Sequence, residues 1–301
     1  YVVDWFDRHS QGTAMGIYGV GDIGAAFTLI ATPLIISEWG WQSVGPFFGI
    51  ALIISAFLFW LIAPTKTFKA QNKYHNISLL SVLKNIQVWR FGLYYYFVFG
   101  SFIALIFWLP HYYISAYRLS LSSAVAFTII FVVTSSMARA LGGWFSDRYG
   151  GRSVNWMVFW ICIVCLFFLS YPPTTMTIHG VDRDVEISIE INVWIFSLLI
   201  ITIGIAQGFG RASVFKTIHE YYPKNMGQIG GFVAGIGSLG GCTLPILFGL
   251  SVDLLGIHTA CFMTLYGVLA CCMATMFFAN KSARLKERVS EARQHNFLDY
   301  D

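Results

Sequence analysis

The sequence has 301 residues, 56% of them hydrophobic and only 11% charged, and its formal net charge at pH 7 is +4. A soluble domain carries about a quarter charged residues, so this composition excludes an ordinary soluble protein and predicts a chain embedded mostly in lipid. All six cysteines fall inside apolar runs, which argues against disulfides and, at Cys162-x-x-Cys165, against a redox or metal site.

Eight apolar runs are long enough to cross a bilayer as helices, which takes about 20 residues each. They are long and continuous rather than short and alternating, so we expect helices and not the strands of a barrel. The opening residues are typical of the tail of one element and a polar loop, and we expect the sequence to lack an N-terminal part of the protein. The runs lie near 13–36, 42–64, 91–116, 122–143, 154–172, 192–213, 226–250 and 259–279.

The first run contains an ionisable residue, Asp22, about ten residues and therefore about 15 Å from its start. A buried carboxylate without a partner tends to be neutral. Three interpretations stay open: an ion pair with an arginine, a proton carrier, and a polar contact in helix packing. We rank the ion pair first and proton carriage second.

The third run carries Tyr94, Tyr95 and Tyr96, and a hydroxyl that faces a transport path can donate to an anion. The fourth run carries Arg139, and an arginine at a helix centre costs about 2.5–3.5 kcal/mol on insertion scales. Either Arg139 extends to the inner interface, or its flat guanidinium binds a planar oxyanion such as nitrate, carboxylate or phosphate. The same two interpretations apply to Arg211, near the inner end of the sixth run.

The seventh run repeats the glycine spacing of the first. Gly235-x-Gly237-x-x-Gly240 matches Gly19-x-Gly21-x-x-Gly24, and a proline follows each, Pro245 and Pro33. Equivalent spans six apart predict two related six-helix halves. Close helix packing explains these glycines as well as an ion path lined by backbone dipoles does. A dinucleotide site is rejected because no strand or soluble βαβ unit surrounds the motif.

The basic residues predict which side of the membrane each loop faces. If loops alternate from a cytoplasmic start, fifteen of the nineteen Lys and Arg residues lie in inner segments, and only Arg118 and Arg183 lie outside. Because cytoplasmic loops are enriched in Lys and Arg, both ends of this sequence are expected in the cytoplasm. The polar stretch 65–90 is then the longest inner loop, and 173–191 is expected to be a solvated outer loop.

The sequence from Gly142 to Arg152 resembles the loop motif G-x-x-x-D-R-x-G-R of the major facilitator superfamily. In that family the loop is cytoplasmic, which agrees with the side predicted from the basic residues. An Asp and nearby Arg residues at helix ends can hold a closed state and release it during rocking. The residues expected to form this latch are Gly143, Asp147, Arg148, Gly151 and Arg152.

A narrower resemblance is to the nitrate/nitrite porter family (NarK-like), in its proton-coupled branch. Its paired nitrate signatures resemble the two glycine motifs, with Gly21, Gly24, Gly235, Gly237 and Gly240, and its substrate arginine on helix 8 matches Arg139. Tyr95 and Phe99 lie in a stretch that resembles the helix 7 lining of its binding site, and the stretch from Gly210 to Lys216 is similar to its helix 10 end.

Two features depart from this family. It usually has Asn where this sequence has Asp22, and an ionised Asp repels nitrate unless it is protonated or paired. The family's other substrate arginine lies on helix 2, which would precede residue 1.

The resemblance implies an all-α polytopic membrane protein with the major facilitator fold, of which helices 5–12 of twelve are present. Residues 1–64 would be the last two helices of the N-terminal bundle, 65–90 the inter-bundle loop, 91–280 the C-terminal six-helix bundle and 281–301 a cytoplasmic tail. It further implies a monomer in the plasma or inner membrane, surrounded by lipid, with no cofactor, metal or nucleic-acid partner.

The implied function is transport of nitrate, with nitrite as a second candidate, by alternating access with proton symport or nitrate/nitrite exchange. Arg139 would hold the anion, and Tyr95, Phe99, Asp22 and the glycines would line its binding site. Asp22, Arg211 and Lys216 are candidates for proton coupling or an ion pair. A permease for another small anion and a sensor that binds without transport stay open as alternatives. A membrane enzyme is not expected, because no His, Asp or Cys cluster lies at a bilayer face.

Overall fold

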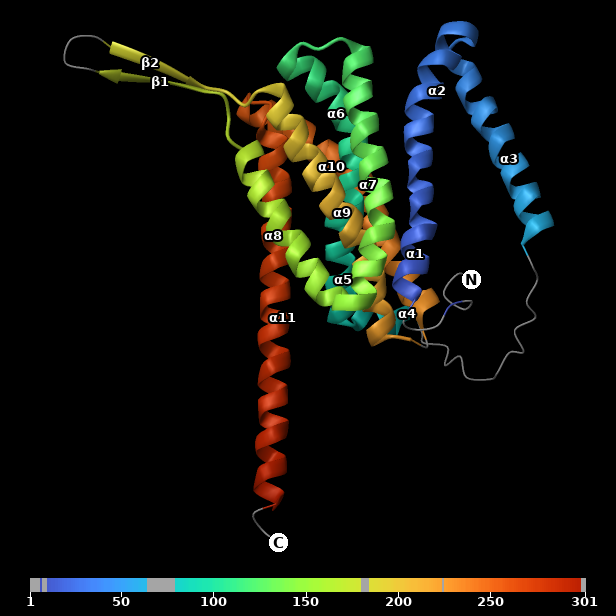
Figure 1. The fold of residues 1–301 in the computed structure, drawn as a ribbon, viewed down its shortest axis with the longest axis vertical. Helices are drawn as coiled ribbons and strands as arrows, with labels where there is room; N and C mark the ends of the chain where they lie inside the picture. The colour runs from blue at the N-terminus through green and yellow to red at the C-terminus, as the bar shows by residue number, and fades with distance from the viewer. Residues whose placement is uncertain (1–5, 7–9, 64–78, 180–183, 224, 299–301) are drawn as a thin grey trace.

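The computed structural model describes residues 6, 10–63, 79–179, 184–223 and 225–298, and this part of the chain is almost entirely helical (Figure 1). It contains eight helical spans that are long and apolar enough to cross a membrane, as the eight apolar runs predict. Five of the spans include a single long helix, namely α7 Leu121–Tyr149, α8 Gly151–Leu169, α9 Val193–Tyr221, α10 Met226–Leu255 and α11 Ala260–Leu298.

The first span is interrupted in its middle. It consists of α1 Gln11–Gly19, a 3₁₀ turn η2 Val20–Ile23 and α2 Gly24–Trp39. Glycines weaken a helix because they lose more backbone entropy than other residues, and two flank this turn while a third lies within it. The turn contains Asp22, so the irregular backbone coincides with the charged residue of this span.

The second and third spans also combine several elements. The second consists of η3 Trp41–Ser43 and α3 Val44–Ile62. The third consists of α5 Ile86–Tyr95, a π-helical turn η4 Tyr96–Gly100 and α6 Ser101–Tyr117, and the short helix α4 Leu79–Lys84 precedes it. The Ser101 hydroxyl donates to the Phe97 carbonyl inside the π turn, and such turns often occur at functional sites.

The core lies where α7 and α9 pack along each other, with α1 against the other side of α7 and α8 against α9. Glycines allow this close approach, since a Cβ added at Gly142 of α7 would collide with the backbone of Phe209, and one added at Gly208 would collide with the Ser135 carbonyl. Small residues at helix interfaces are the usual means of packing inside a membrane. In contrast, α3 contributes no buried residue within the described chain, and Figure 1 shows it apart from the other spans.

Two helices extend beyond their predicted ends. The hydropathy runs end near 143 and 213, whereas α7 continues to Tyr149 and α9 to Tyr221. Polar residues in a last turn do not stop a helix. Each helix ends where the backbone can no longer continue it. Gly150 adopts a φ of +82° directly after α7, and Pro223 follows shortly after α9. Arg139 therefore lies about ten residues, or about 15 Å, inside α7 rather than close to its end.

The segment 173–191, predicted as a solvated outer loop, contains two strands that the sequence analysis did not predict. Residues Thr174–His179 and Asp184–Ile189 form an antiparallel hairpin, β1 and β2, with Thr174 opposite Ile189. Thr and Ile recur in both strands, and β-branched residues favour extended backbone. The hairpin projects from the end of the bundle opposite the start of α1, and α11 continues through the expected tail to Leu298 (Figure 1).

Candidate functional site

The carboxylate of Asp22 lies between two arginines from other spans. Its Oδ2 accepts one hydrogen bond from Nη1 of Arg139 in α7 and another from Nη1 of Arg211 in α9, each over 2.6 Å. Of the three interpretations of Asp22, the structure shows the ion pair. It also brings together two guanidinium groups, although sequence reasoning expected Arg139 to have its partner outside this sequence.

Both guanidinium groups lie inside the protein. Arg211 is fully buried and Arg139 is 5% exposed, whereas the side chain of Asp22 is 25% exposed. The interpretation in which these arginines extend to the membrane interface was therefore wrong. A charge in the membrane interior is costly and is normally paired. Two cations here share one carboxylate, so this ion-pair cluster carries one excess positive charge.

Arg211 is held in place by α7 and α6. Its Nη2 donates to the hydroxyl of Ser135 over 2.8 Å and to the Ser135 carbonyl over 3.2 Å, and its Cζ lies 3.9 Å from the centre of the Phe102 ring. These contacts fix the plane of the guanidinium. The Nε–H of Arg211 and that of Arg139 are both buried, and neither has a hydrogen-bond partner among the described residues.

Arg139 lies directly over Gly19, the first glycine of the glycine motif in the first span. A Cβ added at Gly19 would overlap Nε, Cδ and Cζ of Arg139, and one added at Gly16 would press on the Arg139 carbonyl. Gly19 therefore has a specific steric role that sequence reasoning did not assign to it. The signal was available, since Gly19 precedes Asp22 by three residues and the two lie on adjacent turns of the span.

Tyr95 belongs to the same region. Its charged neighbours are Asp22 and the two arginines that bind Asp22. Its ring stacks on Phe99 with centroids 5.0 Å apart and meets Phe215 edge to face over 4.9 Å. Gly237 packs against the Tyr95 ring, and a Cβ there would overlap it. The structure thus places Tyr95 at the arginine pair and attaches Phe99 and Gly237 to it.

The other predicted glycines lie elsewhere. Gly240 packs against the backbone of Gly100 in the π turn, which is close helix packing of the kind that the alternative interpretation describes. Gly21, Gly24 and Gly235 are exposed, and no atom of the described residues lies within 4 Å of a Cβ built on them. The structure does not bring these three to the arginines, and their role in binding stays a prediction.

Sequence reasoning missed a buried polar residue beside the site, Gln207. Its Nε2 donates to the Ser101 hydroxyl over 2.7 Å, and its Oε1 has no partner among the described residues. Gln207 precedes Arg211 by four residues, so both lie on one face of α9. Polar residues four apart in an apolar run were the sequence signal for this face.

The predicted latch motif joins three spans through Asp147. Its carboxylate accepts from the backbone N–H groups of Gly12 over 2.9 Å and Thr13 over 2.7 Å, from the Thr13 hydroxyl over 2.8 Å, and from Nζ of Lys216 over 2.8 Å. The first N–H groups of a helix have no partner within it and attract an anion. Asp147 of α7 therefore caps α1 and pairs with α9, and Lys216 forms an ion pair here rather than at Asp22.

The other motif residues support this junction differently. A Cβ at Gly143 would collide with the Gly12 carbonyl, and one at Gly151 would collide with α9. The Cζ of Arg148 lies 5.7 Å from the centres of the Trp144 and Tyr149 rings. Arg152 lies 5.6 Å from the Tyr221 ring, so both arginines make cation–π contacts.

The chemistry available at these sites is charge recognition. Within the described residues no group of three His, Cys, Asp or Glu side chains is placed to hold a metal ion. Cys162 and Cys165 are free and buried among apolar side chains. Two fixed guanidinium groups with an unpartnered Nε–H each provide donors for an oxyanion.

Comparison with known proteins gives matches over most of the chain. The model of the Major Facilitator Superfamily matches residues 1–245. The chain is 32% identical over 275 residues to a probable nitrate/nitrite antiporter, NarK1, of Thermus thermophilus, covering 87% of this chain and 62% of that protein. It is 27% identical over 261 residues to a nitrite extrusion protein of Bacillus subtilis, covering 87% and 61%.

A third relative is a probable nitrate transporter, NarT, of Staphylococcus epidermidis. It is 26% identical over 289 residues, covering 94% of this chain and 68% of the relative. The chain thus spans about six to seven tenths of the length of these relatives.

Proposed function

The chain belongs to the Major Facilitator Superfamily, and we propose that it forms part of a transporter that moves nitrate, with nitrite as a second substrate, across the cell membrane by alternating access. The names of the relatives support this substrate class, since they describe a nitrate/nitrite antiporter, a nitrite extrusion protein and a nitrate transporter. The proposal concerns the whole transporter, of which this chain supplies the two converging arginines.

One observation carries the proposal, namely that Arg139 and Arg211 direct Nη1 at a single oxygen of Asp22. An anion that accepts from both groups satisfies the same donors. Nitrate is planar and has three equivalent oxygens, so its oxygens can accept from the Nη1 groups of both arginines. The excess positive charge of the cluster favours such an anion inside the membrane.

The position of Asp22 gives a mechanism for coupling. An incoming nitrate takes the two Nη1 donors, and Asp22 loses its partners. A carboxylate left unpaired in a low-dielectric interior takes up a proton. One anion is then bound together with one proton, which is symport. In nitrate/nitrite exchange, one anion replaces the other while Asp22 stays released.

The sidedness of the transporter is part of the same proposal. The distribution of the basic residues supports a cytoplasmic position for the end with Asp147 and for both ends of this sequence. Asp147 ties α1 to α7 and α9 at that end, so this conformation is closed toward the cytoplasm. The transporter functions as a monomer, because the arginine pair and the latch are built within one chain.

A second candidate substrate class is favoured by Asp22 itself. Its bound group is a carboxylate, so the arginine pair already accepts this chemistry. A permease for small organic anions on the same scaffold would use the same two donors.

Tracer uptake by the full-length protein in proteoliposomes tests the proposal and separates the candidates. Uptake of labelled nitrate is measured in the presence of unlabelled nitrite, formate or acetate as a competitor. We expect nitrite to compete best. Stronger competition by the carboxylates would favour the organic-anion permease, and binding without any flux would reject transport.

A further inference from the structure

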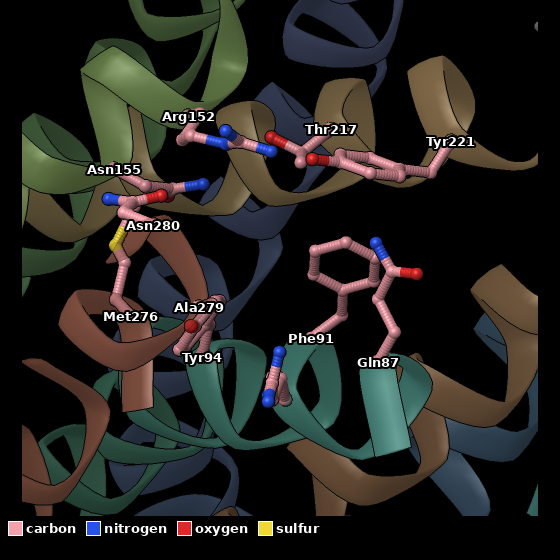
Figure 2. A pocket seen from close by; sticks show the side chains of 11 residues that line it. Gln87, Phe91, Tyr94, Arg152, Asn155, Thr217, Tyr221, Met276, Ala279 and Asn280 are labelled. Atoms are coloured by element: carbon pink, nitrogen blue, oxygen red, sulfur yellow. The ribbon is translucent and has the colours of Figure 1, made fainter. Parts of the chain in front are cut away.

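A second cationic site lies apart from Asp22, in a pocket between α5, α8, α9 and α11 at the latch end of the bundle. Arg90 of α5 and Arg152 and Asn155 of α8 contribute polar groups to its walls. Figure 2 shows Arg152 and Asn155 on one side of the space and Phe91 on the other.

The two arginines of this pocket lie outside the ion pairs of the described residues. Among the described residues, neither Arg90 nor Arg152 forms an ion pair, whereas Arg139, Arg211 and Lys216 all do. The guanidinium of Arg152 lies 5.6 Å from the centre of the Tyr221 ring, and Glu220 is a charged neighbour of it without forming an ion pair.

Further polar groups of the pocket are free to donate. Asn155 is 2% exposed, and its Oδ1 accepts from the Ser213 hydroxyl over 2.6 Å. Its Nδ2 donates to no atom of the described residues. The hydroxyl of Tyr94 has Arg90 and Arg152 as charged neighbours. A buried amide donor and two unpaired guanidinium groups therefore surround one space.

We propose that this pocket binds a phosphate group and that the phosphate is the headgroup of an anionic membrane lipid. Phosphate oxygens accept from guanidinium and amide donors, and arginine forks match their geometry. The apolar part of the wall, with Phe91 and Met276, is suited to the hydrocarbon next to a headgroup.

The sequence around the pocket favours a lipid as the source. Just beyond the pocket residue Asn280, α11 carries Lys281, Arg284, Lys286 and Arg288. Such a cluster at the end of a span attracts anionic lipids, and basic pockets between spans hold their headgroups. The end concerned is the one predicted to face the cytoplasm, where anionic lipids give the surface a negative potential.

The pocket is also next to the latch. Arg152 follows Gly151 of the latch motif, and the wall residue Thr217 follows Lys216, which pairs with Asp147. A bound phosphate would tie α5 and α8 together beside α9, at the end where Asp147 holds α1. Occupancy therefore stabilises this end of the six-helix bundle and alters the rate of opening rather than anion affinity.

The test uses the full-length protein in nanodiscs of phosphatidylcholine, alone or mixed with phosphatidylglycerol, and in phosphatidylcholine with added inorganic phosphate. Lipid retained by the protein is measured by native mass spectrometry, and thermal stability is measured in parallel. The variant Arg90→Gln/Arg152→Gln removes the pocket charges. The control Lys84→Gln/Arg118→Gln removes the same charge from two exposed positions that do not line the pocket.

We expect phosphatidylglycerol to bind the wild type and the control and to bind the pocket variant about thirtyfold more weakly, as two basic groups at about 1 kcal/mol each imply. Stabilisation by inorganic phosphate alone, lost in the pocket variant, would assign the site to free phosphate instead of lipid. Equal lipid binding by all three proteins would overturn the proposal. These readouts do not depend on nitrate transport, so they can succeed or fail separately from the proposed function.

Discussion

Oδ2 of Asp22 lies 2.6 Å from Nη1 of Arg211, although 189 residues separate them in the sequence. The same oxygen lies 2.6 Å from Nη1 of Arg139. The 3₁₀ turn in the first span thus carries a carboxylate that is bound to the two Nη1 groups. A transported anion would need these same donors. This relationship connects the fold to the proposed coupling of anion and proton, and the following predictions test its parts.

Replacing Arg139 with lysine should remove most transport. Lysine keeps the charge but lacks the planar set of N–H donors of a guanidinium. Nitrate can therefore not replace Asp22 at the same donor positions. A hydrogen bond to a charged group contributes about 1.5–3 kcal/mol, and we expect initial uptake at low nitrate to fall about tenfold to a hundredfold. The control is Arg118→Lys, an exposed position near the other end of the bundle. Undiminished uptake in Arg139→Lys would reject the assigned role.

Replacing Asp22 with asparagine should uncouple proton movement from anion movement. Asparagine keeps the shape of the side chain but neither binds a proton nor competes as an anion. We expect nitrate-driven proton uptake, followed with a pH dye inside proteoliposomes, to disappear while nitrate still exchanges for nitrite. Proton uptake that continues at the wild-type ratio to nitrate would show that another group carries the proton.

The paired variants Gly19→Ala and Gly21→Ala separate steric contact from open space. A methyl group at Gly19 overlaps the Arg139 side chain, whereas one at Gly21 meets nothing within 4 Å in the described residues. We expect Gly19→Ala to lower nitrate uptake at least tenfold by displacing Arg139, and Gly21→Ala to stay near the wild type. The reverse pattern would favour the glycine signature itself, with Gly21, as the substrate path.

Replacing Asp147 with asparagine should loosen the latch. Its carboxylate holds the N–H groups of Gly12 and Thr13, which have no partner within α1, and pairs with Lys216. We expect faster hydrogen exchange in peptides that cover the start of α1, measured by mass spectrometry. Arg148→Gln serves as the control because the ring contacts of its guanidinium, within the described residues, are to Trp144 and Tyr149 on its own helix. Identical exchange in both variants would show that Asp147 does not hold the spans together.

The sequence predicts the spans well because lipid selects long apolar runs, and all eight are present. It predicts helix ends poorly, since α7 ends at the positive φ of Gly150 and not where polar residues begin. The hairpin that starts at Thr174 was missed because short alternating strands resemble a polar loop in hydropathy.

The candidate site was predicted in part. Asp22 and Arg139 stand out in the sequence because a charged residue inside a membrane span is energetically costly and usually functional. The addition of Arg211 to this pair follows from which faces of α7 and α9 meet at Gly208, and spacing along one chain does not determine that. The same holds for the arginines of the lipid-headgroup pocket, which come to line one space only once α5 and α8 are placed together.

The central claim is that nitrate binds between Arg139 and Arg211 in place of Asp22. Solid-state NMR of the full-length protein in bilayers, with ¹⁵N-nitrate and ¹³C-labelled arginine, measures this contact through dipolar dephasing of the Cζ signals. We predict two dephased signals, one lost in Arg139→Lys and the other in Arg211→Lys. Dephased signals that survive both substitutions would place the anion elsewhere and contradict the account.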